Sequence, residues 1–179
     1  VELLTGMLTG LAAWQFGCGP EALSAFILIW ILIALTGIDI DTQLLPDSMT
    51  LALLWIGLAV NLFDTWTSLP SAVMGAMFGY GSLWSVYWVF KLVTGKEGMG
   101  YGDFKLLAAL GAWFGWQTVP VMILLSSFAG ALLGISILIL RRLERDTPMP
   151  FGPYLAGAGL VILFFGETLM TEYLQRVAL

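Results

Sequence analysis

The chain contains no histidine and only one cysteine, Cys18, among its 179 residues. Without histidine, nucleophilic sites of the Ser–His and Cys–His types are excluded. A single cysteine also excludes an internal disulfide and a zinc site built from several thiolates, so no metal site is expected. Of the side chains that commonly carry out catalysis, the carboxylates remain.

Charged residues are scarce as well: they make up 11% of the chain, whereas 59% of the residues are hydrophobic. A soluble domain of this length could not bury so much apolar surface. The positive mean hydropathy and the eight tryptophans instead indicate a polytopic membrane protein. The net charge of -5 does not favour nucleic-acid binding. Because the first residue is Val1, we expect a fragment or a processed product.

Long apolar runs divide the chain into segments that predict seven helices and no barrel strands. The runs cover residues 3–19, 22–38, 49–63, 69–93, 104–116, 117–140 and 151–166. The fifth is shorter than the ~20 residues needed to span hydrocarbon. We therefore predict an all-α polytopic membrane helix bundle that forms a single membrane-embedded domain over residues 1–179. Asp47 or Ser48 is expected to cap the third helix, and three Gly-x-x-x-Gly pairs, at 6/10, 75/79 and 130/134, are candidates for close helix contacts.

The basic residues predict the orientation of this bundle. If all seven segments cross, the connections 39–48, 92–103 and 141–150 lie on the side of the N-terminus. Six of the seven basic residues lie in or near these connections: Lys91, Lys96, Lys105, Arg141, Arg142 and Arg145, with Arg176 alone on the other side. Since positive charge accumulates on the cytoplasmic side, that side is predicted to be cytoplasmic.

The same count places two acidic residues, Asp39 and Asp103, at one membrane surface. Taken singly, Asp39 could be a solvated charge at a helix end, and Asp103 could be a helix N-cap. As a pair they suggest chemistry, because ionisable groups near hydrocarbon are costly and commonly functional. Two adjacent carboxyls share a proton, so one can activate water while the other polarises a carbonyl, which is aspartic peptide hydrolysis.

Five neighbouring residues are candidates for supporting roles. Gly100 and Gly102, in the sequence Gly-Tyr-Gly-Asp, leave room for a substrate strand. Asp41 is expected to be an exposed loop charge and Asp47 a helix cap. Lys105 could tune the pair, although a lysine that extends to the membrane interface is the better explanation.

The runs Ile38-Asp39-Ile40-Asp41-Thr42-Gln43-Leu44-Leu45-Pro46-Asp47 and Gly98-Met99-Gly100-Tyr101-Gly102-Asp103-Phe104-Lys105-Leu106 resemble two signature blocks of bacterial type IV prepilin peptidases. Pro150-Phe151-Gly152-Pro153-Tyr154-Leu155-Ala156 resembles a third. The resemblance covers essentially the whole chain.

This resemblance implies a multi-pass aspartic protease of the bacterial inner membrane, with its active site facing the cytoplasm. It implies cleavage of a basic leader from type IV prepilins and type II secretion pseudopilins, with Asp39 and Asp103 as the catalytic pair and no cofactor for proteolysis. Many members also methylate the new N-terminus with S-adenosylmethionine, and they carry a cytoplasmic region with two CxxC pairs. This chain lacks that cysteine-rich region, so we expect methylation, if any, from the full-length protein.

Alternatives to this function remain. A preflagellin peptidase shares the chemistry, and an ion-coupled transporter also uses paired carboxylates, although near the membrane midplane. A methyltransferase or structural subunit is a third alternative, but no glycine-rich nucleotide motif supports it. Within the pair, helix dipoles predict Asp103, at a helix N-terminus, as the ionised base and Asp39, at a helix C-terminus, as the protonated partner.

Overall fold

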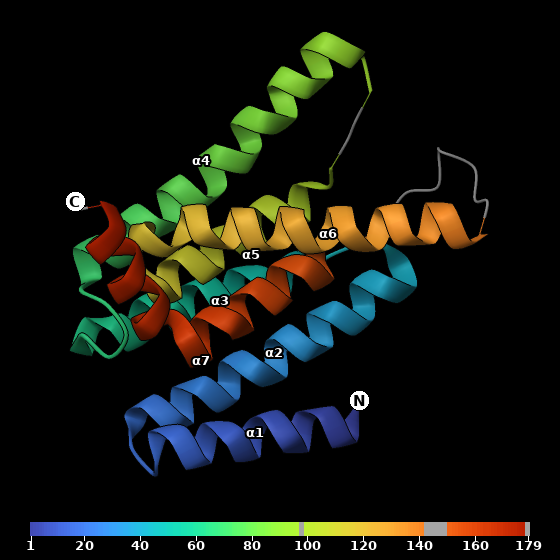
Figure 1. Cartoon of the computed structure of the whole chain (residues 1–179). Coiled ribbons are helices and arrows are strands. Elements are labelled where there is room, and N and C mark those ends of the chain that lie inside the picture. Colours follow the sequence, from blue (N-terminus) through green and yellow to red (C-terminus); the bar gives the residue numbers. More distant parts are fainter. Residues whose placement is uncertain (97–98, 142–149, 178–179) are drawn as a thin grey trace.

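The computed structural model describes the backbone of residues 1–96, 99–141 and 150–177. This part of the chain holds seven α-helices and no strand (Figure 1). The helices are α1 (Glu2–Phe16), α2 (Pro20–Thr42), α3 (Asp47–Val60), α4 (Leu69–Thr94), α5 (Tyr101–Phe114), α6 (Val119–Arg141) and α7 (Gly152–Val177). Two short 3-10 turns, Asn61–Phe63 and Trp116–Thr118, follow α3 and α5. The predicted all-α class, the number of helices and the short fifth helix are confirmed.

The helix ends differ from the prediction at α3. Its first residue is Asp47, and the capping position is taken by Pro46, whose backbone is extended. The expectation that Asp47 or Ser48 caps this helix is therefore wrong. Pro46 has the fixed φ of proline and an extended ψ, so it is the last residue of the loop before the helix. The acidic Asp47 then falls in the first turn, where the helix dipole favours negative charge.

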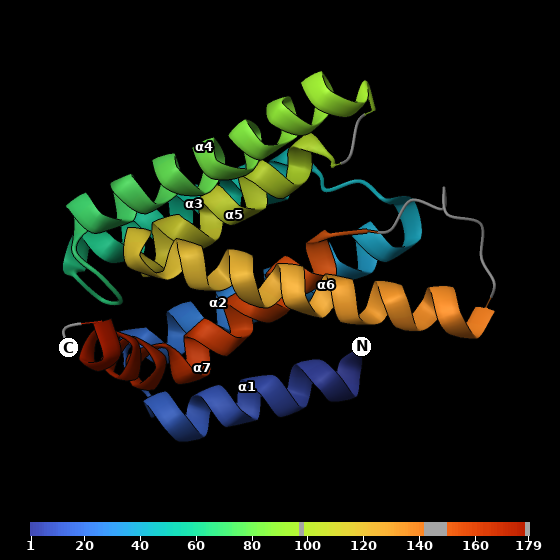
Figure 2. The same cartoon turned by 45° about the horizontal axis from the view of Figure 1, so that its top comes forward.

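The helices run back and forth, so alternate connections lie at the same end of the bundle. Figure 2 shows α1 beside α2 on one side and α4 beside α5 on the other, with α6 and α7 between them. The C-terminal end of α2 and the N-terminal ends of α3, α5 and α7 gather at the end where the N-terminus lies (Figure 1). This agrees with the predicted sidedness of Asp39 and Asp103. The side chains of Arg141, Arg142, Arg145 and Arg176, which entered that prediction, lie outside the described residues.

Helix α5 lies in the core of the bundle. Every residue from Asp103 to Phe114 is buried except Lys105. At its far end, the Trp113 indole donates to the carbonyl of Leu53 in α3 at 2.9 Å. The buried Asn61 amide donates to the carbonyls of Ala112 and Trp113, both at 2.8 Å. The last carbonyls of a helix lack intrahelical partners, so Asn61 satisfies part of this need and fixes the end of α5.

Helices α4 and α5 pack backbone to backbone through glycines. A Cβ on Gly75 would collide with the carbonyl of Gly111, and one on Gly111 would collide with the carbonyl of Gly75. A Cβ on Gly79 would lie 2.6 Å from the carbonyl oxygen of Leu107. The predicted close contact at the 75/79 pair is confirmed. The 6/10 pair has open space around it, so the prediction fails there, while Gly130 has ordinary contact with the Tyr154 ring.

The outer surface is apolar over much of its area. Among the residues that the structure describes, two helical spans are long and apolar enough to cross a membrane, Pro20–Thr42 and Trp116–Ser136, and two shorter apolar spans are Asp47–Phe63 and Gly152–Gly166. Large hydrophobic side chains are exposed on several helices, among them Trp14, Trp55, Phe78, Leu124 and Phe128. Such a surface is unfavourable in water and is typical of a helical membrane bundle.

Replacing Gly75 by alanine should destabilise the bundle by about 1–3 kcal/mol, because the methyl group must push α4 away from the backbone of α5. Gly81→Ala, in the same helix, is the matched control, since nothing lies within 4 Å of its Cβ position. Thermal unfolding in detergent measures both. Equal melting temperatures for the two variants would show that α4 and α5 do not need this approach.

Candidate active site

Asp39 lies in the last turn of α2, and only 4% of its surface is exposed. The helix continues to Thr42, and Gln43 ends it in the left-handed conformation with its N–H bonded to the Asp39 carbonyl. The side chain accepts a 2.9 Å hydrogen bond from the backbone N–H of Gly152, at the start of α7. The reading of Asp39 as a solvated helix-end charge is therefore wrong.

Asp103 is the third residue of α5 and is 6% exposed. Gly100 holds the capping position, so Asp103 is not the N-cap that its sequence context also allowed. Its own N–H donates to the carbonyl of Gly100 at 3.2 Å, and the amide of Gly100 interacts with the Asp103 carboxyl. Both acidic side chains are thus buried next to a backbone amide of a glycine.

The two carboxyls are close enough for their charges to interact. They come from helices separated by α3 and α4 in the sequence, and the loop residue Leu45 lies between the helices that surround them. A Cβ on Gly102 would be 2.6 Å from the Cβ of Leu45, and one on Gly152 would be 3.2 Å from its Cδ1. Leu45 is itself 9% exposed. It therefore packs against Gly102 and Gly152, the glycines that lie next to Asp103 and Asp39.

The remaining candidates lie farther from this centre. Asp41 and Asp47 are exposed. For Asp41 the predicted exposure is confirmed, but the predicted loop position is wrong, because α2 continues to Thr42. Lys105 forms an ion pair with Asp47, with its Nζ 2.6 Å from Oδ1. This pair joins the second turn of α5 to the first turn of α3. Lys105 thus has a partner other than the aspartate pair, and neither of the two sequence interpretations foresaw it.

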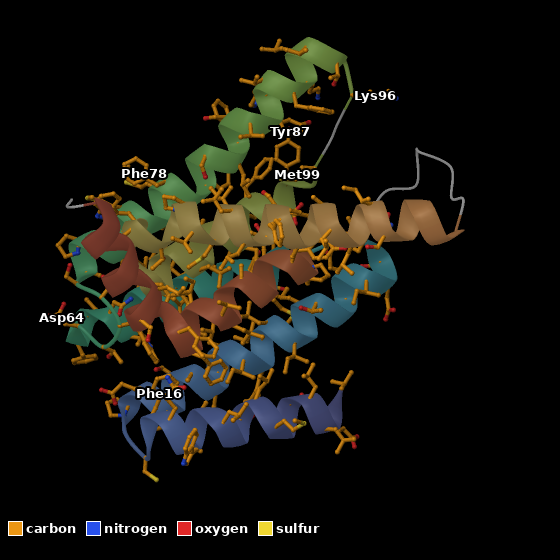
Figure 3. The ribbon with its side chains drawn as sticks, in the orientation of Figure 1. Phe16, Asp64, Phe78, Tyr87, Lys96 and Met99 are labelled. Atoms are coloured by element: carbon orange, nitrogen blue, oxygen red, sulfur yellow. The ribbon has the colours of Figure 1, made fainter. Side chains whose placement is uncertain are left out.

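A cluster of aromatic rings packs between α4 and the start of α5, near Asp103. Tyr87, Tyr101 and Phe104 contact one another with ring centroids 5.2–5.6 Å apart. Figure 3 shows Tyr87 pointing from α4 toward the segment at Met99 that leads into α5. Tyr87 is almost fully buried, and Met99 packs against the core that includes it. This cluster holds the Gly-Tyr-Gly-Asp turn against α4.

Sequence reasoning missed the contact between Gly152 and Asp39. The block around Gly152 was noticed only through its resemblance, with no role attached to the glycine. A glycine directly before Pro153 at the start of an apolar helix is a weak signal by itself. Its contact with a residue 113 positions away becomes visible only once α2 and α7 are packed together.

Two buried, interacting carboxyls at one end of a helical membrane bundle define a candidate aspartic hydrolase site. In the part of the chain that the structure describes, no group of three or more possible ligands could hold a metal ion.

Comparison with known proteins identifies the family. The model of the type IV leader peptidase family matches residues 26–135, and the chain belongs to this family. No solved structure gives a significant match.

Three relatives are named prepilin leader peptidase/N-methyltransferase. The protein of Stutzerimonas stutzeri is 57% identical over 175 residues, which cover 98% of this chain and 61% of the relative. The protein of Pseudomonas aeruginosa is 58% identical over 98% of this chain and 60% of its own length. That of Xanthomonas campestris is 49% identical over the whole chain and 62% of its own length. The chain thus spans about three fifths of the length of these relatives.

The Lys105–Asp47 pair should contribute little to stability, because it lies at the surface, where solvent screens it. We expect a coupling free energy of about 0.2–1 kcal/mol in a double-mutant cycle of Lys105→Met and Asp47→Asn, falling as salt is added. Unfolding of the four proteins in detergent gives this value. A coupling well above that range, unchanged by salt, would mean that the pair is part of the buried framework.

Proposed function

We propose that this chain is the peptidase part of a membrane-embedded aspartic endopeptidase that removes the leader from type IV prepilins and type II secretion pseudopilins. The burial of Asp39 and Asp103 at the same end of the bundle, within range of each other's charge, is the observation that carries the proposal. The family of the chain and the names of its relatives support prepilins as the substrate class. The finer assignment, that these two residues are catalytic, is part of the proposal.

The pair supplies the proton transfers that peptide hydrolysis requires. With one proton between them, the ionised carboxylate takes a proton from water as the water attacks the scissile carbonyl carbon. The protonated carboxyl donates a hydrogen bond to the carbonyl oxygen and stabilises its developing charge. Collapse of the tetrahedral intermediate then needs a proton on the leaving nitrogen, which the first aspartate now carries.

The substrate is proposed to reach this pair from the cytoplasmic side of the bacterial inner membrane. Lys91, Lys96 and Lys105 lie near the same end of the bundle as the aspartates, which fits the charge bias of cytoplasmic surfaces. The exposed Asp41 and Asp47 offer negative charge to a basic leader. Glu97, another acidic residue of this region, lies outside the described residues.

A transporter is the alternative from another functional class. Ion-coupled transporters place their carboxylates near the membrane midplane, in interrupted helices. Here Asp39 lies in the last turn of an uninterrupted helix and Asp103 in the first turn of another. Both positions favour a site at the membrane edge, where water for hydrolysis is available.

Methyl transfer is not assigned to the described residues. S-adenosylmethionine needs a pocket that holds its adenosine, and glycine-rich loops between a strand and a helix commonly provide one. The described part of the chain is helical throughout and has no such loop. We propose that proteolysis needs no cofactor and that methylation, which the names of the relatives include, requires more of the protein than these residues.

Asp39→Asn and Asp103→Asn should each lower the rate of prepilin cleavage by about 10²- to 10⁴-fold, since each removes one side of the proton transfer. Asp41→Asn and Asp47→Asn, which change a nearby exposed carboxylate, are the comparison variants: they should weaken binding of the leader at most and retain clear activity. Leader removal from a purified prepilin, followed by mass spectrometry, measures the rates. Near-wild-type cleavage by either of the first two variants would falsify the assignment.

The two glycines before Asp103 should differ in their tolerance of alanine. A Cβ at 100 meets only the Asp103 carboxyl at 3.7 Å, an ordinary contact, whereas one at 102 meets Leu45 at 2.6 Å. We expect Gly102→Ala to displace Asp103 or Leu45 and to slow cleavage by about tenfold to a hundredfold. Gly100→Ala should stay near the wild-type rate. The opposite order in the same assay would contradict the geometry of this turn.

A further inference from the structure

We propose that the start of α7 is a third component of the active site and that the N–H of Gly152 positions the carboxyl of Asp39. The inference rests on the proposed function and adds a positioning residue to it. Its basis is a 2.9 Å hydrogen bond from the Gly152 N–H to Asp39 Oδ2, in a buried environment, between helices far apart in the sequence.

Among the first residues of α7, Gly152 donates its N–H to this carboxyl, while the next N–H groups are bonded elsewhere. The N–H groups of Tyr154 and Leu155 both bond to the carbonyl of Phe151. Pro153, between them and Gly152, has no N–H. The Gly152 amide is the first of the helix, where no intrahelical acceptor exists, and it points at Asp39. The positive end of the α7 dipole therefore faces this carboxyl.

Glycine is required here for close approach rather than for an unusual backbone angle, since Gly152 is not among the residues with positive φ. A Cβ at this position would lie 2.5 Å from Asp39 Oδ2 and 3.1 Å from its Cγ. It would also lie 3.2 Å from Leu45 Cδ1. Any larger residue would push the carboxyl out of its place and break the hydrogen bond.

The hydrogen bond occupies one oxygen of Asp39 and fixes the plane of the carboxyl. Proton transfer by Asp39, in either direction, then uses the other oxygen, Oδ1. Holding a catalytic group in the right orientation lowers the activation free energy and can account for a large part of a rate enhancement. Gly152 touches neither water nor substrate in this scheme, so it acts through Asp39.

Helix α7 contains a matched series of glycines for the test. Gly157 has nothing within 4 Å of its Cβ position, and a Cβ on Gly159 would lie 2.6 Å from Leu110 Cδ2, far along the bundle from Asp39. Gly159→Ala thus introduces comparable crowding without touching the carboxyl. We expect Gly152→Ala to lower kcat for prepilin cleavage at least about tenfold, as for loss of a hydrogen bond to a charged group, with KM nearly unchanged. Gly159→Ala should lower the melting temperature but keep kcat, and Gly157→Ala should change neither.

A spectroscopic measurement separates positioning from general damage and does not depend on activity. In protein labelled with ¹³C-aspartate, the infrared band that disappears in Asp39→Asn belongs to Asp39. This band should shift in Gly152→Ala and stay in place in Gly159→Ala. An unchanged band in Gly152→Ala, or an equal loss of kcat in Gly159→Ala, would overturn the inference. A shifted band in a protein whose wild type cleaves no prepilin would refute the proposed function and support the positioning of Asp39.

Discussion

The cost of burying two carboxyls in an apolar interior is the constraint on which the arrangement of the helices depends. Asp39 and Asp103 are each almost fully enclosed, and an isolated carboxylate in such surroundings is strongly unfavourable. Backbone amides of two glycines, Gly152 and Gly100, offset part of this cost. Three helices must therefore meet at one point, because α2 and α5 carry the acids and α7 brings the amide of Gly152.

The position of Asp103 is set mainly from the opposite end of α5. Asn61 and the carbonyl of Leu53 hold the last turn, through the hydrogen bonds to Ala112 and from Trp113. A helix of 14 residues is a rod of about 21 Å, so fixing its far end and one face limits where its first turn can lie. The glycine contacts with α4 fix that face. Packing deep in the bundle thus places a carboxyl at its edge.

The sequence predicted the helices well because long apolar runs separated by glycine, proline and charge leave little choice of secondary structure. It also predicted the sidedness of Asp39 and Asp103, since that depends only on counting segments. The predicted cap of α3 was wrong because Asp47 and Ser48 are typical capping residues, whereas the extended backbone of Pro46 places the capping position one residue earlier. The Lys105–Asp47 pair and the Gly152–Asp39 bond could not be predicted, because each joins helices whose relative placement depends on side-chain packing along the whole bundle.

The contact with α7 also changes how the two aspartates compare. From the sequence, Asp39 lay at the negative end of α2 and Asp103 at the positive end of α5, which predicted different ionisation for the two. In the structure Asp39 also faces the positive end of α7, so this difference in helix dipole is largely removed. Each acid then has a helix N-terminus and a glycine amide beside it, and the charges of the two acids interact. Similar helix-end surroundings for the two carboxyls fit the proposed hydrolysis, in which one proton passes from water to the leaving amine through the pair, because the acids exchange roles during the reaction.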